Sequence, residues 1–162
     1  MTLAATSFSS LANWTGGVSY INISDNVGYS DISLGVVAGS LGYEFNTSEK
    51  FSLVPELRIG LGIKDDEFDW IVDVDVEVER FVSFSVRGQY DFNNTWYAYA
   101  APSYTNLELK ASLDDYFDSA DESEFGFSAG FGINLTETTA IEVTFEDFDG
   151  TNLVGAGLKF AF

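Results

Sequence analysis

The chain has 162 residues, and its 26 Asp and Glu against 7 Lys and Arg give a net charge of −19; it contains no histidine and no cysteine. A chain of this length forms one domain, and the missing residue types exclude disulfides, thiolate metal sites and the commonest general base. The charge argues against binding nucleic acid through a basic patch. Apolar residues never run together for the ~20 positions that a membrane-spanning helix needs, so the chain can cross a bilayer only as a closed barrel of strands with about 9 to 11 residues each.

Residues 1–12 precede the first predicted strand, which begins at Asn13. The chain opens MTLAATSFSSLA, which is small, weakly apolar and uncharged, and Ser10 and Ala12 have the spacing of a signal-peptidase site before Asn13. A complete signal peptide has a basic region and a longer apolar run. We therefore expect residues 1–13 to be either the remnant of an export signal or a short periplasmic lead-in, and residues 14–162 to form the folded domain.

The first two predicted strands cover residues 13–24 and 34–45. In the first, the apolar residues change parity between Tyr20 and Ile21, which predicts a β-bulge near Tyr20. In the second, the residues expected to point outward are Val37, Leu41, Tyr43 and Phe45, and those expected to point inward are Ala38, Ser40, Gly42 and Glu44.

The third predicted strand, residues 51–64, indicates which face of the sheet is the inner one. Its apolar residues alternate with small or polar ones, and Glu56 and Arg58 stand two positions apart on the second face. In a soluble half-buried strand the polar face meets water, whereas glycines beside a close Glu/Arg pair suit the cramped, polar inside of a narrow barrel. We therefore expect the apolar face to point outward, into lipid.

Residues 72–92 form the longest alternating run, about twice the length that a bilayer needs. The even-numbered valines and aromatic residues are expected outward, and the odd-numbered acidic and polar residues inward. Arg80 interrupts the outward face. We therefore expect residues 82–92 to span the membrane, residues 73–79 to stand above it, and Arg80 to reach lipid phosphates at the interface.

The fifth predicted strand covers residues 96–113. We expect Tyr97, Tyr99 and Leu107 to point outward, and we expect a bulge at Pro102, because proline cannot donate to a ladder and a closed barrel has no edge strand to hold it. The last three strands cover residues 125–135, 141–146 and 153–162, and their outward residues are Phe125, Phe127, Ala129, Phe131, Ile133, Leu135, Ile141, Val143, Phe145, Val154, Ala156, Leu158, Phe160 and Phe162.

These eight strands predict an all-β fold, an eight-stranded antiparallel up-and-down transmembrane β-barrel. Short turns at residues 46–50, 93–94 and 136–139 alternate with longer or acidic connections, and 19 of the 26 acids lie on the side of those connections. Bacterial outer-membrane barrels have this arrangement of short turns on one side and longer loops on the other.

Outward aromatic residues gather beside the short turns and the end of the chain, as they do at a membrane interface. The predicted lipid-interface residues are Arg80, Tyr90, Phe92, Tyr97, Phe160 and Phe162. The alternative is that the aromatic residues form the hydrophobic core of a soluble barrel.

The pattern from Trp14 onward resembles the small outer-membrane barrels of the OmpA/OmpX-like superfamily. The ending VGAGLKFAF, with Leu158, Phe160 and Phe162 at alternate positions, looks like the signature that the outer-membrane assembly machinery recognises, and NWTGGVSY looks like the first strand of such barrels. The resemblance implies a place in the bacterial outer membrane, in contact with its lipid and lipopolysaccharide. It departs from full-length OmpA proteins, because no peptidoglycan-binding domain follows Phe162.

Charged residues on the inward parity form the candidate site. Unpaired charge in a narrow lumen is costly, so these residues should form networks; the set is Glu44, Glu56, Arg58, Arg87, Glu142 and Lys159, with Glu146, Lys64 and Lys110 as further members. One hypothesis is that the networks plug and rigidify a barrel that is only just wide enough to be filled by side chains. The alternative is a narrow gated ion channel.

For function, we expect a non-enzymatic protein with a structural or surface-interaction role of the adhesion type. The membrane-barrel enzymes that the pattern resembles rely on histidine, which this chain lacks, and no cofactor is expected. Calcium binding by the acidic loops stays open, although none of them has the spacing of a calcium loop. Residues 72–79 and 106–113 are predicted to project as a β-ribbon that binds an extracellular protein partner by strand addition.

Overall fold

The computed structural model describes residues 13–27, 30–64, 66–70, 72–113 and 116–162. Residues 1–12, and with them most of the expected export remnant or lead-in, lie outside the described residues. Within the described part, no helix is long and apolar enough to cross a membrane.

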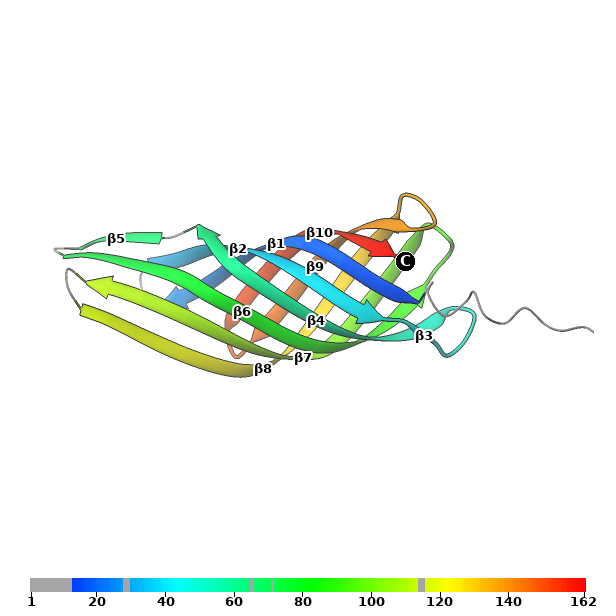
Figure 1. Cartoon of the computed structure of the whole chain (residues 1–162), viewed down its shortest axis with the longest axis horizontal. Helices are drawn as coiled ribbons and strands as arrows, with labels where there is room; N and C mark the ends of the chain where they lie inside the picture. The colour runs from blue at the N-terminus through cyan, green and yellow to red at the C-terminus, as the bar shows by residue number, and fades with distance from the viewer. Residues whose placement is uncertain (1–12, 28–29, 65, 71, 114–115) are drawn as a thin grey trace, which may run out of the picture.

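Eight antiparallel strands close into a barrel (Figure 1), which confirms the predicted fold class. Pairing of β1 with β10 and of β4 with β6 closes the sheet. Two further short strands, β3 and β5, pair with β4 and β6 respectively. The strands are β1 (Trp14–Val27), β2 (Ser30–Tyr43), β3 (Phe45–Asn46), β4 (Phe51–Lys64), β5 (Asp66–Trp70), β6 (Val72–Asp91), β7 (Trp96–Leu113), β8 (Tyr116–Asn134), β9 (Thr139–Phe148) and β10 (Thr151–Ala161).

Large apolar side chains cover the outside of the barrel. Leu61 on β4 is 62 % exposed and Phe125 on β8 is 71 % exposed, and the same holds for apolar residues of the other barrel strands. A monomeric soluble protein rarely exposes so continuous an apolar surface, whereas a barrel in lipid requires one. The predicted outward parity of β2, β4, β8, β9 and β10 is confirmed.

The bulge predicted near Tyr20 is wrong. The register of β1 with both neighbouring strands is continuous from Thr15 to Ser24. Ile21 and Ile23 simply point inward, where they are 1 % and 4 % exposed. The parity of β1 does not change, because this part of the barrel interior is apolar and accepts both isoleucines.

The bulge predicted at Pro102 is also wrong, and the register shifts instead between Val78 and Arg80 on β6. Pairing of β6 with β7 stops at Ser103 and resumes at Ala100 in the same register, and Pro102 is exposed on the outside. At the shift, Val78 and Phe81 both point inward, so the parity of β6 changes there.

The parity of β7 is opposite to the prediction. Tyr97 and Tyr99, expected at the outer surface, are 4 % and 7 % exposed and point inward. Tyr97 is therefore not a lipid-interface residue. Its register partner on β8 is Gly132, and that of Tyr99 is Gly130; a Cβ at either glycine would overlap the tyrosine ring opposite. The glycines supply the space that the rings fill.

Strands β5 to β8 continue well beyond the barrel at one end of the molecule (Figure 1). The β9–β10 hairpin ends lower, at a turn in which Asp149 and Gly150 have positive φ, whereas β7 and β8 pair as far as Leu113 and Tyr116. We call residues 66–77 and 109–122 of these strands the projecting sheet. It contains two strands more than the predicted ribbon.

Candidate functional site

The first layer of charged side chains fills the lumen near the short turns. Arg87 donates from Nη2 to Glu142 Oε1 at 2.5 Å and from Nη1 to Glu142 Oε2 at 3.3 Å, and its Nη1 also reaches Glu56 Oε2 at 3.3 Å. Lys159 completes the group through an ion pair with Glu56 and a hydrogen bond of 3.0 Å to Ser40 Oγ. These residues come from β6, β9, β4 and β10, so the layer ties together strands from all sides of the barrel. We call it the Arg87 layer.

Two tyrosines hold the Arg87 layer in place. Tyr97 Oη donates to Glu142 Oε1 at 2.8 Å. The guanidinium carbon of Arg87 lies 3.6 Å from the centre of the Tyr99 ring, a cation–π geometry. Tyr99 Oη is 2.6 Å from Thr144 Oγ1. Sequence reasoning missed both tyrosines; the glycines opposite them on β8 were the signal that could have found them.

A second charged layer lies deeper in the lumen. Arg58 forms a two-point ion pair with Glu146, with 2.7 Å between Nη2 and Oε2. Its Nη2 also donates to Ser83 Oγ at 3.0 Å, and Thr105 Oγ1 donates to the same hydroxyl at 2.9 Å. On the far side the guanidinium faces the ring of Phe81, 5.5 Å from its centre. We call this group the Arg58 layer.

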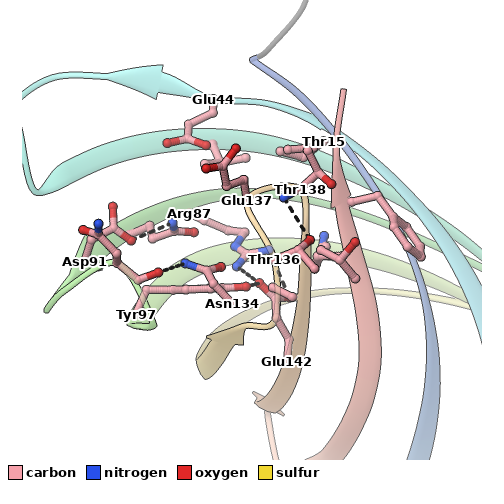
Figure 2. Close-up of a pocket in the computed structure, with 18 of the residues that line it drawn as sticks. Thr15, Glu44, Arg87, Asp91, Tyr97, Asn134, Thr136, Glu137, Thr138 and Glu142 are labelled. Atoms are coloured by element: carbon pink, nitrogen blue, oxygen red, sulfur yellow. Dashed lines mark hydrogen bonds and ion pairs between the residues drawn. The ribbon is translucent and has the colours of Figure 1, made fainter.

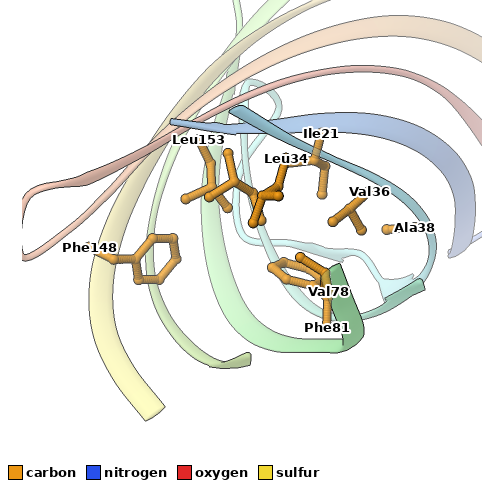
Figure 3. Close-up of a cluster of buried hydrophobic side chains, with 9 residues drawn as sticks. Ile21, Leu34, Val36, Ala38, Val78, Phe81, Phe148 and Leu153 are labelled. Carbon is orange, nitrogen blue, oxygen red and sulfur yellow. The ribbon is translucent and has the colours of Figure 1, made fainter. Parts of the chain in front are cut away.

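On the side of the Arg58 layer that faces the projecting sheet, the lumen is filled by apolar side chains (Figure 3). All of them are at most 4 % exposed, and Leu107 packs against them. This apolar layer consists of Ile21, Ile23, Leu34, Val36, Ala38, Val78, Phe81, Phe148 and Leu153. Sequence reasoning predicted charged networks inside the barrel but not this layer, because a narrow lumen was expected to be polar throughout.

A cavity of ≈ 550 Å³ opens at the short-turn end of the barrel (Figure 2). Its inner wall is the Arg87 layer, and Glu44 and Asp91 stand on its sides. Further along the lumen lie two small cavities of ≈ 30 Å³ and ≈ 40 Å³, each with room for about one water molecule. The lumen is therefore wide at one end and filled by side chains in its middle and upper parts.

The predicted network residues occupy two separate layers. Glu56, Arg87, Glu142 and Lys159 meet in the first, and Arg58 lies in the second. Glu44 stands apart on the wall of the cavity. The side chains of Lys64 and Lys110 are outside those that the structure describes.

The remaining predicted interface residues lie on the outer surface. Tyr90, Phe92, Phe160 and Phe162 are exposed near the short turns, and the rings of Tyr90 and Phe92 meet edge to face at 5.4 Å. Arg80 is exposed at the opposite end, beside the bulge, and pairs with Glu108 at 3.1 Å. Among the described side chains no three acids lie close enough together to hold a metal ion.

The family model of the outer membrane protein beta-barrel domain matches residues 1–162 of the chain. No curated protein sequence matches this chain. Among solved structures, Ail, the attachment invasion locus protein of Yersinia pestis, has a TM-score of 0.68 at 15 % identity over 93 % of this chain and 99 % of that one. The complex of Ail with the heparin analogue sucrose octasulfate has a TM-score of 0.68 at 14 % identity, with coverages of 93 % and 98 %.

Two further barrels are similar. Neisserial surface protein A has a TM-score of 0.66 at 10 % identity, with coverages of 92 % and 97 %. The N-terminal β-barrel domain of Pseudomonas aeruginosa OprF has a TM-score of 0.53 at 15 % identity, with coverages of 90 % and 97 %. At such low identity these likenesses concern the fold. The family match, the closed barrel and its apolar outer surface together show that the chain belongs to the outer membrane protein beta-barrel family and lies in the bacterial outer membrane.

Proposed function

We propose that this protein is a non-enzymatic outer-membrane barrel, closed to solutes, which holds the projecting sheet at the cell surface for adhesion-type interactions. The observation that carries the proposal is the contrast between the barrel and the projecting sheet. The barrel interior is filled by three packed layers, whereas β5 to β8 extend beyond the barrel as paired strands.

The layers support a closed lumen. Each described guanidinium or ammonium group inside the barrel has a carboxylate partner, and breaking a buried pair costs several kcal/mol, about 3 to 5. An ion that passed the Arg87 and Arg58 layers would next meet the apolar layer, which offers it no polar group. Transport would require all three layers to rearrange.

The narrow gated channel is the second candidate. Arg87 contacts both Glu142 and Glu56, so its guanidinium has two carboxylates between which to move. The open cavity at the short-turn end would then be the entrance, and Arg58 and Arg87 the gate residues.

The projecting sheet supports the surface role. Longer connections of outer-membrane barrels face the outside and short turns the periplasm, so the projecting sheet would stand in the extracellular space. Ail has been crystallised with a heparin analogue, a polyanion. This chain carries a net charge of −19, with most acids at the projecting end, so a polyanion is a poor partner for it.

Contacts with the membrane and with the assembly machinery belong to the same proposal. The outward positions of Leu158, Phe160 and Phe162 on the terminal strand suit recognition by the assembly machinery, and exposed Arg80 beside the projecting end suits a lipid or lipopolysaccharide phosphate. Residues 1–13 remain proposed as a lead-in or export remnant.

Conductance of single molecules in a planar bilayer tests the closed lumen. The refolded protein is first shown to be a folded barrel by the difference in gel migration between boiled and unboiled samples. Inserted protein should be silent. Discrete, reproducible steps would overturn the closed lumen and support the channel.

A truncated barrel tests the surface role. Residues 67–75 and 111–118 are each replaced by an Asn-Gly turn, because Asp66 pairs with Val76 and Lys110 with Ser119 in the strand register, and a two-residue turn can join such partners. Bacteria that display the full chain should adhere to cultured epithelial cells or to each other more than bacteria that display the truncated barrel. Equal adhesion at equal surface levels would contradict the surface role.

A further inference from the structure

The cavity at the short-turn end of the barrel has the size of a small-ligand site. It measures ≈ 550 Å³, within the range of pockets that bind small molecules, and we call it the short-turn cavity. Glu44, between β2 and β3, and Asp91, the last residue of β6, both line it (Figure 2). Both side chains are half-buried.

These two carboxylates differ from the buried carboxylates of the lumen. Glu56, Glu142 and Glu146 each form an ion pair with an arginine or a lysine. Glu44 and Asp91 form no ion pair with any side chain that the structure describes. A carboxylate that is partly removed from water is stabilised by a compensating charge. Two of them on the walls of one cavity therefore favour a cation as its occupant.

The inner wall of the short-turn cavity does not repel a cation. The Arg87 layer contains two basic and two acidic side chains joined by ion pairs, so the layer as a whole is neutral. Nearer the opening, Glu49 and Glu137 line the cavity together with Lys50. Among the described residues, the lining beyond the neutral layer thus has four acids and one lysine, and its net charge is negative.

The neutral polar groups of the lining suit an ammonium group. Gln89 Nε2 donates to Asp91 Oδ1 at 3.2 Å, and Asn134 Nδ2 donates to the backbone oxygen of Asn94 at 3.1 Å. Each amide thus uses its nitrogen within the protein and keeps its oxygen as an acceptor. An ammonium group only donates hydrogen bonds, so these amide oxygens and the two carboxylates complement it.

Apolar side chains in the same lining favour an organic cation over a metal ion. Val54 and Ala140 are buried, at 3 % and 6 % exposed, and both line the short-turn cavity. The described side chains include no group of three acids that could hold a metal ion. Methylene groups between two ammonium groups would contact the apolar positions, whereas a hydrated metal ion would gain nothing from them.

We propose that the short-turn cavity binds an aliphatic diamine or polyamine, with one ammonium group against Glu44 and Asp91 and another near Glu49 and Glu137 at the opening. The site lies at the opposite end of the molecule from the projecting sheet, so the proposal goes beyond the surface role and does not depend on it. Short turns of such barrels face the periplasm, so the amine enters from that side. Binding requires no rearrangement of the Arg87 layer, which forms the inner end of the site.

Calorimetric titration of the full chain with spermidine tests the proposal. The chain is inserted in nanodiscs of zwitterionic lipid, because anionic lipid would itself attract the amine, and empty nanodiscs give the blank. Spermidine should bind saturably, with one molecule per barrel. A diol of the same chain length, which keeps the methylene groups but has no charge, should not bind. No saturable binding of spermidine would overturn the proposal.

Charge-neutralising variants locate the site. Glu44→Gln/Asp91→Asn should weaken spermidine binding by at least about tenfold, because it removes both partly buried carboxylates. Asp147→Asn/Asp149→Asn removes the same charge from exposed positions at the opposite end, and should change binding less than about twofold, since salt screens distant surface charges. Equal loss in the two folded variants would show attraction by net charge alone and overturn the site.

A cysteine placed in the lining tests the location with every carboxylate of the short-turn cavity intact. The chain has no cysteine, so Thr15→Cys, at a residue of the lining, introduces a single thiol. Saturating spermidine should slow the reaction of this thiol with a neutral maleimide several-fold, and the completed label should abolish binding. Asp147→Cys, at the opposite end, should show neither effect. Unchanged labelling of Thr15→Cys would place the amine elsewhere and overturn the site.

Discussion

Arg87 and Tyr99 form the central contact of the lumen: the guanidinium carbon lies 3.6 Å from the centre of the tyrosine ring, and both side chains are buried. The same guanidinium group reaches across the lumen to Glu142 on β9. Arg87 on β6 thus contacts the neighbouring strand β7 through the Tyr99 ring and the opposite wall of the barrel, on β9, through an ion pair. Removal of the arginine would break both contacts.

Arg87→Ala should lower the free energy of unfolding by about 3 to 5 kcal/mol, because it leaves Glu142 and Glu56 buried with less compensating charge. Urea unfolding in lipid vesicles, followed by tryptophan fluorescence, measures the change. Arg80→Ala is the matched control; its exposed pair with Glu108 should contribute about 1 kcal/mol or less. A large conductance with unchanged stability would refute this structural role and support the channel.

Phe81→Ala should destabilise the barrel by about 3 to 5 kcal/mol, because it opens a cavity in the apolar layer. Phe84→Ala, on the lipid side of the same strand, is the control and should cost less, since Phe84 is 51 % exposed to the outside. Neither Phe81→Ala nor Arg87→Ala should produce conductance, and the double variant should also be silent, since the Arg58 layer still fills the lumen. Discrete conductance steps from a folded double variant would show that the Arg58 layer does not close the lumen by itself.

Gly132→Ala should destabilise the barrel by about 1 to 3 kcal/mol, because the new methyl group would overlap the Tyr97 ring and force it from its place. Gly155→Ala is the comparison within the same barrel, since a Cβ there would meet no atom closer than 3.5 Å. Thermal gel-shift midpoints rank the two. Equal midpoints would mean that Tyr97 moves aside without cost.

The truncated barrel should remain folded, with a change in unfolding free energy of about 1 kcal/mol or less, because the residues removed lie outside the three layers. Removing residues 72–79 together with 106–113 should instead destabilise the barrel, because that deletion takes away Val78 and Leu107, which belong to the apolar layer or pack against it. Gel migration and urea unfolding of both deletions test this. Equal loss of stability would show that the projecting sheet and the barrel form one unit.

The sequence alone determined the number of strands in the barrel, the side of the short turns and the lipid-facing parity of most of these strands. In β4, β8 and β10 one face is apolar and the other small or polar, so period-two alternation leaves a single assignment. It also determined that charged residues such as Arg58, Arg87 and Glu142 share the inner face, because parity is a local property of a strand.

Only the tertiary structure decided what depends on residues far apart in the chain. In β7 both parities contain aromatic residues, and Tyr97 is placed inside by the space above Gly132 on the neighbouring strand. The position of the bulge at Val78 and Arg80, the division of the charges into two layers and the apolar layer above them follow from how eight strands meet around one axis. Alternation assigns a side chain to one of two faces, but its partner across the lumen is set by the stagger of the closed barrel.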